Sequence, residues 1–309
     1  MRVLVTGAAG GIGRALLERL AGKAEVVSLA LDEREEQCLR RFQPSAVVRG
    51  DLRALDDAVV GPALAACDAV VHLAALVHSP AASSADYHEV NVAGTRRLVE
   101  LYGRSRCAGP RHVVLVSTVA VFGPGREAPY AEVDEPRPHT PYAVSKLEAE
   151  NAVLAAAAGD PALRTTILRP VTVYGVAGDR GNVGRMLRFI GRWHAWPVVG
   201  DGANRKGLIH VDDVARAIEA SLTDPRALDR VFVVAGGDDP SMIDLLAAIR
   251  QVLGLRVAAV RVPRAAAALL PPLRKLAETT RYDGSQIRAA LGLQPLPLAE
   301  GLALMRGRR

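Results

Sequence analysis

Short apolar runs rich in β-branched residues alternate along most of the chain with longer stretches rich in Ala, Leu and Arg. The apolar runs, each predicted to form a strand, cover residues 3–6, 25–30, 46–49, 69–73, 112–117, 165–169 and 231–234. The longer stretches have helical spacing and predict helices over 11–22, 33–42, 54–66, 92–106, 141–157 and 211–223. Such alternation is typical of βαβ units, in which helices cover both faces of a parallel sheet. We therefore predict an α/β fold built on a doubly wound parallel sheet.

The regular alternation fades beyond residue 175, where Pro and Gly become frequent. Helices are still predicted near 182–193, 241–253 and 284–291. We expect a main domain over residues 1–175, to which 205–235 returns, and a smaller C-terminal cap made of 176–204 and 236–309.

Composition and charge narrow the class of protein. The 309 residues include 39 basic and 33 acidic side chains, which gives a net charge of +6, and half of the residues are hydrophobic. Because the chain has no block of like charges and no basic stripe interleaved with aromatics, we expect no nucleic-acid partner. No apolar run reaches the length of a membrane span and no signal-peptide core is present, which predicts a soluble cytoplasmic protein without a membrane partner. The segment 265–270 could dock on a membrane, but a buried helical turn or an oligomer contact is the preferred interpretation.

The cysteines agree with that location. Cys38, Cys67 and Cys107 stand far apart, without the spacing of a disulfide framework or of a metal site. We therefore expect free thiols in a reducing compartment and no bound metal.

A glycine-rich turn follows the first predicted strand. Gly7, Gly10 and Gly13 stand three residues apart, and a predicted helix follows at once. Glycine permits a tight turn and lets the backbone approach a diphosphate closely, while the helix N-terminus offers free N–H groups and a positive dipole end. This placement predicts a dinucleotide-binding Rossmann domain.

An acidic residue follows the second predicted strand. Asp32 lies 19 residues after Gly13, where a carboxylate would hold the ribose hydroxyls of NAD. Alternatively, Asp32 caps the helix that begins there. NAD is favoured as the cofactor, while Arg34 keeps NADP open as an alternative because its cation would suit a 2′-phosphate.

Tyr142 and Lys146 lie at the start of a long predicted helix. Residues at i and i+4 share a helix face, so the phenol and the ammonium would point into one site. A free phenol has a pKa of about 10, too high for a general base at neutral pH, and a neighbouring ammonium plus an oxidised nicotinamide would favour the phenolate. Ser117 and Thr118, at the end of the fifth predicted strand, offer a hydroxyl that would position a substrate alcohol. The alternative is a surface tyrosine beside a solvated lysine.

At this point the chain resembles the extended short-chain dehydrogenase/reductases, and within them the NAD-dependent epimerase/dehydratase group that acts on nucleotide sugars. The resemblance rests on TGAAGGIG at 6–13, GDL at 50–52, HLAA at 72–75, NVAGT at 91–95, STVAVFG at 117–123, YAVSK at 142–146, RPVTVYG at 169–175, HVDDVA at 210–215 and RYD at 281–283. It implies a cap that binds substrate and a homodimer through the helices near 92–106 and 141–157.

The resemblance also implies roles for individual residues. Tyr142 would be the catalytic acid or base, Lys146 its pKa-lowering and ribose-binding partner, and Thr118 the catalytic hydroxyl. The cofactor would contact Gly7, Gly10, Gly11, Ile12, Gly13, Asp32, Asp51, Leu52, Leu73, Ala74, Ala75, Asn91, Tyr142, Lys146 and Pro170. The nucleotide-diphosphate sugar would contact Val77, His78, Thr118, Asn182, Arg205, Lys206 and Arg281.

One departure from the family pattern bears on the reaction. The family's 4,6-dehydratases resemble TDEVYG, with an acidic pair after the threonine, whereas this chain has the apolar Val119 and Ala120. A dehydratase, and a decarboxylase that relies on the same glutamate, are therefore disfavoured. A nucleotide-sugar C4 epimerase that works through a 4-keto intermediate is favoured, with a 4-ketoreductase as the alternative and a non-catalytic NAD(P)-binding sensor as a minor one.

Overall fold

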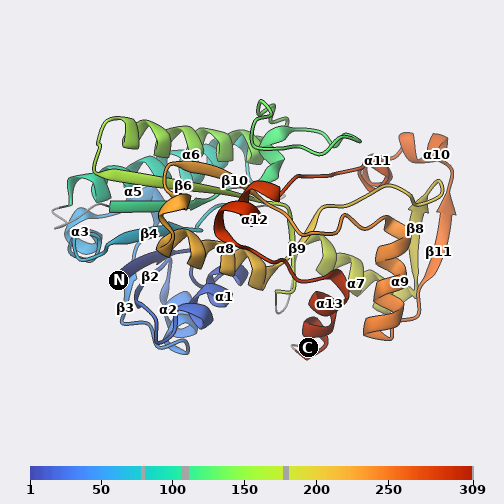
Figure 1. Ribbon diagram of the computed structural model, residues 1–309, viewed down its shortest axis with the longest axis horizontal. Helices are drawn as coiled ribbons and strands as arrows, with labels where there is room; N and C mark the ends of the chain where they lie inside the picture. Colours follow the sequence, from blue (N-terminus) through green and yellow to red (C-terminus); the bar gives the residue numbers. More distant parts are fainter. Residues whose placement is uncertain (78–80, 106–110, 177–180, 308–309) are drawn as a thin grey trace.

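The computed structural model describes residues 1–77, 81–105, 111–176 and 181–307. Its centre is a parallel sheet of seven strands in the order β10-β6-β5-β4-β1-β2-β3 (Figure 1). The strands are β1 (Arg2–Thr6), β2 (Glu25–Ala30), β3 (Ala46–Arg49), β4 (Ala69–His72), β5 (Arg111–Val116), β6 (Leu163–Pro170) and β10 (Arg230–Val234). β1 pairs with both β2 and β4, so the strand order reverses there. Ligands of open α/β sheets bind outside the carboxyl ends of the strands at such a reversal.

Helices cover both faces of this sheet, which confirms the predicted doubly wound fold (Figure 1). One face carries α1 (Gly11–Leu20), α2 (Glu33–Arg40) and α8 (Val211–Thr223), and the other carries α3 (Asp57–Ala65), α5 (Gly94–Arg104) and α6 (Pro141–Ala158). The strands supply side chains to both: Val3 and Val5 are buried with Leu16 of α1, whereas Leu4 is buried with Leu98 of α5. Because both faces are covered, the strands are continuous apolar runs rather than alternating ones.

Shorter elements join these helices and strands. They are η1 (Leu52–Ala54), α4 (Ser84–Tyr87), the π-helical η2 (His88–Ala93), η3 (Val119–Phe122) and η4 (Pro225–Ala227). The π-helical turn runs directly into α5, so the predicted helix over 92–106 begins in a wider turn. Among the residues that the structure describes, no helix is both long and apolar enough to cross a bilayer.

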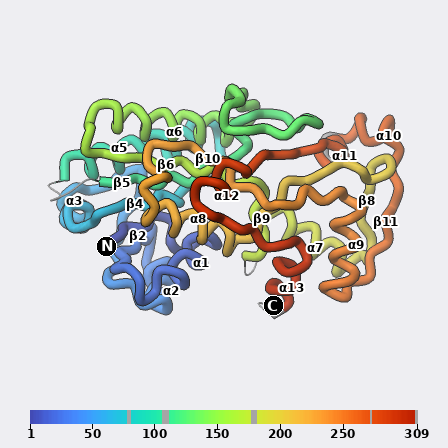
Figure 2. The backbone as a smooth tube through the Cα atoms, in the orientation of Figure 1, coloured from blue at the N-terminus to red at the C-terminus, as the bar shows by residue number. Residues whose placement is uncertain are grey.

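A second lobe lies beside the carboxyl edge of the sheet and has its own apolar core (Figure 1). It contains α7 (Asn182–Trp193), β8 (Ala195–Val199), α9 (Met242–Leu253), β11 (Ala258–Val262), α10 (Arg264–Ala268), α11 (Pro271–Ala277) and α13 (Leu298–Gly307). β8 pairs with β11, and β7 (Thr172–Tyr174) pairs with β9 (Leu208–His210) where the lobes join. The chain crosses between the lobes several times (Figure 2).

One helix expected in the cap lies elsewhere. α12 (Ser285–Leu291) packs on β10 and α8, and Ile287 and Leu293 are buried in the core of the main sheet. The chain returns to the main lobe through Tyr282, which forms a β-bridge with Tyr130. The segment near 284–293 therefore belongs with the sheet rather than with the predicted cap of 236–309.

Candidate active site

The glycine turn between β1 and α1 can hold only glycine at its tightest points. Gly7 has a φ of +65°, and a Cβ there would lie 2.6 Å from the backbone nitrogen of Ala74. A Cβ at Gly13 would lie 2.5 Å from the carbonyl oxygen of Gly7. The glycines therefore let the loop after β4 and the first turn of α1 close onto β1.

The N-terminus of α1 is open toward this turn. Gly10 is its N-cap, no described side chain caps the helix, and its first turn has no acidic residue. The unpaired N–H groups and the positive end of the helix dipole suit a diphosphate. Gly7 and Gly10 line two cavities, one on each side of the turn. The cradle therefore fits the diphosphate of a dinucleotide that reaches into both cavities.

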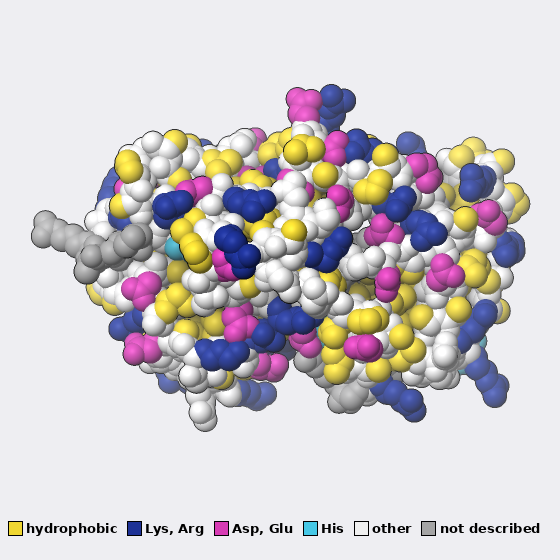
Figure 3. All heavy atoms as spheres, in the orientation of Figure 1, with side chains coloured by type: hydrophobic (Ala, Val, Ile, Leu, Met, Phe, Trp, Pro, Cys, Tyr) yellow, Lys and Arg dark blue, Asp and Glu magenta, His cyan; other side chains and the backbone are white. Residues whose placement is uncertain are grey.

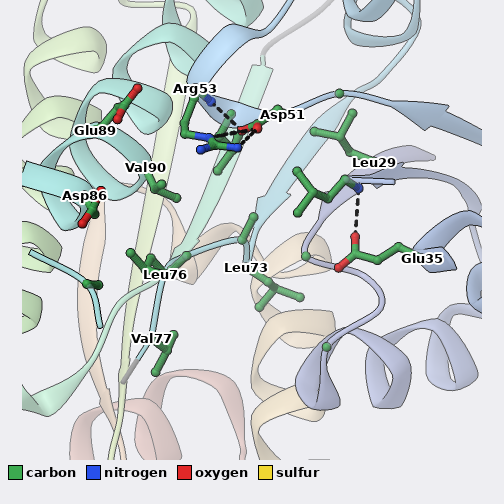
Figure 4. Close-up of a pocket in the computed structure, with 18 of the residues that line it drawn as sticks. Leu29, Glu35, Asp51, Arg53, Leu73, Leu76, Val77, Asp86, Glu89 and Val90 are labelled. Carbon is green, nitrogen blue, oxygen red and sulfur yellow. Dashed lines mark hydrogen bonds and ion pairs between the residues drawn. The ribbon is translucent and has the colours of Figure 1, made fainter. Parts of the chain in front are cut away.

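The first cavity has a volume of about 700 Å³ and lies over the ends of β1, β2 and β4. Its lining includes the predicted cofactor residues Asp51, Leu52, Leu73, Ala74 and Ala75, together with Val77. Asp51 pairs with Arg53 at 2.5 Å, and Glu35 accepts a hydrogen bond from the backbone N–H of Leu31 at 2.9 Å (Figure 4).

Acidic side chains dominate this first cavity. Glu35, Asp51, Asp86 and Glu89 line it, and Arg53 is the one cation among its described lining residues. The Arg53 guanidinium holds the pKa of Asp51 below its usual value. The cavity therefore presents a net negative charge to its ligand.

Asp32 does not line either cavity. Its side chain accepts a hydrogen bond from the backbone N–H of Glu35 at 2.8 Å and caps α2. The structure thus favours the capping alternative over the predicted ribose-binding role of Asp32. Glu35, three residues later, is the carboxylate of this helix that reaches the cavity (Figure 4). The sequence does not predict a cofactor contact for Glu35, because an acidic residue in the first turn of a helix is common and forms part of no motif.

The second cavity, of about 540 Å³, brings all three predicted catalytic residues together. Five of the residues predicted to bind cofactor or substrate line both cavities: Gly7, Gly10, Leu73, Ala75 and Val77. The predicted site residues that line the second cavity alone are Gly11, Ile12, Gly13, Thr118, Tyr142, Lys146, Pro170 and Asn182. α6 begins at Pro141, with Thr140 as its N-cap, and this start places Tyr142 and Lys146 on the cavity side. Ser117 also lines this cavity, and its buried hydroxyl has no hydrogen-bond partner among the described residues.

Burial sets the protonation of the two central groups. It raises the pKa of Tyr142 to about 12, although a hydrogen bond with Thr118 acts in the opposite direction. It lowers the pKa of Lys146 to about 8, opposed by the negative charge of Glu150. Lys146 Nζ donates to the carbonyl oxygen of Val116 at 2.9 Å. Loss of water therefore outweighs the hydrogen bond with Thr118, and the phenol is neutral in the protein alone. That Lys146 together with an oxidised nicotinamide favours the phenolate stays a prediction.

Buried polar contacts hold these groups in place. Glu150, one turn after Lys146 on α6, forms a buried ion pair with Arg169 at 2.6 Å. Asn91, predicted to contact the cofactor, is itself buried: its side chain accepts from the N–H of Leu76 at 2.7 Å and donates to Ser145 Oγ at 2.9 Å. Asn91 therefore fixes the loop after β4 against α6 and lies behind the cavity wall.

Three predicted substrate residues do not line the two cavities and make other polar contacts instead. Arg205 donates to the carbonyl of Asp239 at 2.7 Å, and Lys206 donates to the carbonyl of Glu278 at 2.6 Å. Arg281 pairs with Asp239 at 3.2 Å. His78 lies outside the described residues.

Two charged residues of the second lobe that the sequence analysis does not predict line the second cavity. They are Lys275 at the end of α11 and Glu278 just after it. Both stand more than 100 residues from Tyr142 in a segment without a motif. Within the described ranges, no three His, Cys, Asp or Glu side chains gather in a way that would hold a metal ion.

Comparisons with known proteins agree with this geometry. The N-acetyl-alpha-D-glucosaminyl-diphospho-ditrans,octacis-undecaprenol 4-epimerase of Escherichia coli O157:H7 is 28% identical, over 97% of this chain and 92% of the relative. The solved structure of MoeE5 in complex with UDP-glucuronic acid and NAD is 30% identical with a TM-score of 0.79, over 100% of this chain and 98% of that one. UDP-glucuronic acid 4-epimerase from Bacillus cereus, in complex with NAD, shares the fold with a TM-score of 0.81 at 22% identity, over 100% and 96% of the two chains.

The match to a family model covers most of the chain. The model of the NAD dependent epimerase/dehydratase family spans residues 3–235, from β1 to the end of the last sheet strand. This range holds the glycine turn, Thr118, Tyr142 and Lys146, and it confirms the resemblance seen in the motifs. The chain belongs to the NAD dependent epimerase/dehydratase family.

Proposed function

We propose that this chain is an NAD-dependent C4 epimerase of a nucleotide-diphosphate sugar. The observation that carries the proposal is the convergence of Thr118, Tyr142 and Lys146 in a cavity that shares the glycine turn with an acidic second cavity. The Escherichia coli relative is named as a 4-epimerase of a diphospho-sugar, and the MoeE5 structure holds UDP-glucuronic acid and NAD. Val119 and Ala120 line the same cavity and offer no acid for a dehydration.

NAD fits the site because the glycine turn leaves no room for a Cβ and the N-terminus of α1 is open. When bound, NAD would supply a hydride acceptor and a positively charged nicotinamide ring. Tyr142 would take the proton of the sugar C4 hydroxyl and return it, and Thr118 would hold that hydroxyl in line with the phenol. Lys146 keeps a cation within the buried site, and its pKa of about 8 leaves it mostly protonated at neutral pH.

We propose that the second lobe forms the substrate-binding cap, without the segment near 284–293. Asn182, Lys275 and Glu278 support this assignment because they face the catalytic cavity from that lobe. Lys275 would meet the diphosphate of the substrate, the role that the sequence predicted for Arg205, Lys206 and Arg281, and its position in the lining of the cavity supports this role. We also propose a cytoplasmic location, which suits Cys38 and Cys67 because neither forms a disulfide.

The reaction is tested by incubating the purified protein with UDP-, dTDP- and GDP-sugars. We expect one of these sugars to interconvert with its C4 epimer without consumption of NAD, because the hydride taken from C4 returns to C4. The readouts are bound NAD released on denaturation and the sugar epimer ratio. Stoichiometric oxidation of NADPH by a 4-keto sugar, without epimer formation, would instead assign the chain to the 4-ketoreductases.

The charge of the first cavity predicts a preference for NAD over NADP. Glu35 lies on the cavity wall, so replacing it by Gln removes a charge that would repel a 2′-phosphate. We expect E35Q to raise NADP affinity relative to NAD by about tenfold, measured by calorimetric titration of the two cofactors. The matched control is E33Q, which removes an exposed acid of the same helix outside the cavity. Equal ratios in E35Q and E33Q would contradict the role of Glu35.

We propose a homodimer through α5 and α6. A groove between these helices is lined by Val92, Val99, Ala152, Ala155 and Ala156 among others, and the nearby Leu154 is exposed. Small and apolar side chains on paired helices suit close packing against a second copy. We expect Ala155→Arg to convert a dimer to a monomer in light scattering, whereas A21R, an exposed alanine after α1, leaves the mass unchanged. A wild-type monomer would refute the proposal.

A further inference from the structure

The tip of the cap carries exposed leucines that the rest of the fold does not cover. The tip is residues 261–275, which run from the end of β11 through α10 to the last turn of α11. Leu269 is 82% exposed and Leu270 is 53% exposed, while Ala267 is buried and anchors α10 to the lobe. A buried helical turn, one of the two interpretations preferred from the sequence, therefore does not describe these leucines, and the other, an oligomer contact, stays a prediction.

The tip is also strongly basic. It contains Arg261, Arg264, Arg274 and Lys275 and no acidic residue. The nearest acidic contact is Asp201, which lies 3.7 Å from Arg264 with both side chains largely exposed. Figure 3 shows hydrophobic and basic side chains together at the end of the molecule where α10 lies in Figure 1. Cations therefore stand on both sides of the exposed leucines.

The backbone around the two exposed leucines is already hydrogen-bonded, so moving it from water to an apolar medium costs little free energy. The N–H groups of Ala267, Leu269 and Leu270 donate to carbonyls within the same turn, and those of Leu273 and Arg274 donate to Leu270. The two prolines between them have no N–H at all. Unpaired N–H groups are what makes an irregular backbone costly in an apolar medium, and those of the two exposed leucines are already paired.

We propose that the tip docks on the surface of an anionic lipid bilayer. The leucines would enter the boundary between headgroups and acyl chains, and Arg261, Arg264 and Arg274 would remain at the level of the lipid phosphates, while Lys275 faces the catalytic cavity. Charge complementarity selects this occupant. A second copy of the chain would place the same four cations against each other in a two-fold contact, which is unfavourable.

Docking would bring the catalytic cavity close to the membrane. Leu270 is the N-cap of α11, and Lys275, five residues further along, lines that cavity. Five residues of helix correspond to about 7.5 Å along its axis. The proposal is independent of the epimerase reaction, because lipid binding is measured without turnover.

The test is flotation of the full-length protein with vesicles of phosphatidylcholine, with or without phosphatidylglycerol. We expect the wild type to float with the phosphatidylglycerol vesicles, less so at high salt, and only weakly with phosphatidylcholine alone. The double variant L269D/L270D should lower partitioning by about tenfold or more, because two apolar side chains no longer leave water. R264Q/R274Q should remove the preference for phosphatidylglycerol.

The control is V133D, which adds one of these negative charges at a valine that is 87% exposed and lies outside the tip and both cavities. V133D should float as the wild type does, and all variants should keep the wild-type melting temperature. Equal flotation of the wild type and L269D/L270D would overturn the proposal. A wild type that does not bind vesicles would also overturn it, including the case in which L269D/L270D changes the oligomeric mass and so points to a second copy as the occupant.

Discussion

Replacing Tyr142 by Phe is expected to lower the rate of epimer interconversion by about 100- to 10,000-fold, with little change in stability. The phenol is the proposed proton carrier for the C4 hydroxyl, and general acid–base groups contribute rate factors of about this size. The phenylalanine ring keeps the edge-to-face contact with Tyr87, whose ring centre lies 6.1 Å away. The measurements are the turnover number, the bound NAD content and the melting temperature.

The control for this variant is Tyr87→Phe. It also removes a phenol hydroxyl, but Tyr87 does not line either described cavity. We expect Y87F to retain turnover near that of the wild type, so that a loss confined to Y142F assigns the proton transfer to that hydroxyl. Full turnover by Y142F would refute the catalytic role and favour a cofactor-binding protein without chemistry at this tyrosine.

The state of Tyr142 gives this prediction a further consequence. Burial, with a smaller effect of Tyr87, raises the pKa of the phenol to about 12 despite the hydrogen bond with Thr118, so the protein's own groups hold it neutral. A neutral phenol can donate a proton to a 4-keto oxygen, which is the return half of an epimerisation and also the whole of a ketoreduction. Removing a proton needs a lower pKa, which the fold does not provide by itself. The pH profile of sugar oxidation at C4, which needs proton removal, should therefore be compared with that of 4-keto sugar reduction, which needs proton donation. An epimerase must perform both half-reactions at the same pH, whereas a ketoreductase needs only the reduction.

The sheet was predictable because its strands are buried on both faces. β2 and β3 have the predicted bounds, and β1 and β10 each begin one residue earlier than expected. The length of such a strand can be read from the sequence, because polar residues and turns end the apolar run on each side. The Tyr-x-x-x-Lys pair and the glycine turn were predictable for a similar reason, because each is local and each constrains the backbone or a helix face.

The placement of distant segments was not predictable in the same way. The helix over 284–291 was expected, yet its periodicity shows which face is apolar and not which surface it covers, so its packing on α8 was missed. Lys275 was missed because its approach to Tyr142 depends on the position of a whole lobe. Asp32 and Glu35 illustrate the limit at short range: both are acids near the end of β2, and only the start of α2 decides which one caps and which one faces the cavity.

Replacing Gly7 by Ala is expected to lower the free energy of unfolding by about 2–5 kcal/mol and to abolish NAD binding. A positive φ costs an L-residue about 1–2 kcal/mol, and overpacking adds about 1–3 kcal/mol. The new Cβ would lie 2.6 Å from the backbone nitrogen of Ala74 and 2.8 Å from the carbonyl carbon of Leu73. Backbone atoms cannot rotate away, so the loop after β4 must move from both cavities that it lines.

Gly22 supplies the matched control for this variant. It also has a positive φ, of +73°, but a Cβ there would meet nothing within 4 Å. Gly22→Ala should therefore show only the conformational cost of about 1–2 kcal/mol in urea unfolding and should retain bound NAD. The difference between G7A and G22A measures how closely the loop after β4 approaches β1. Equal losses of stability in the two variants, with NAD retained in both, would show that this close approach does not build the cofactor site.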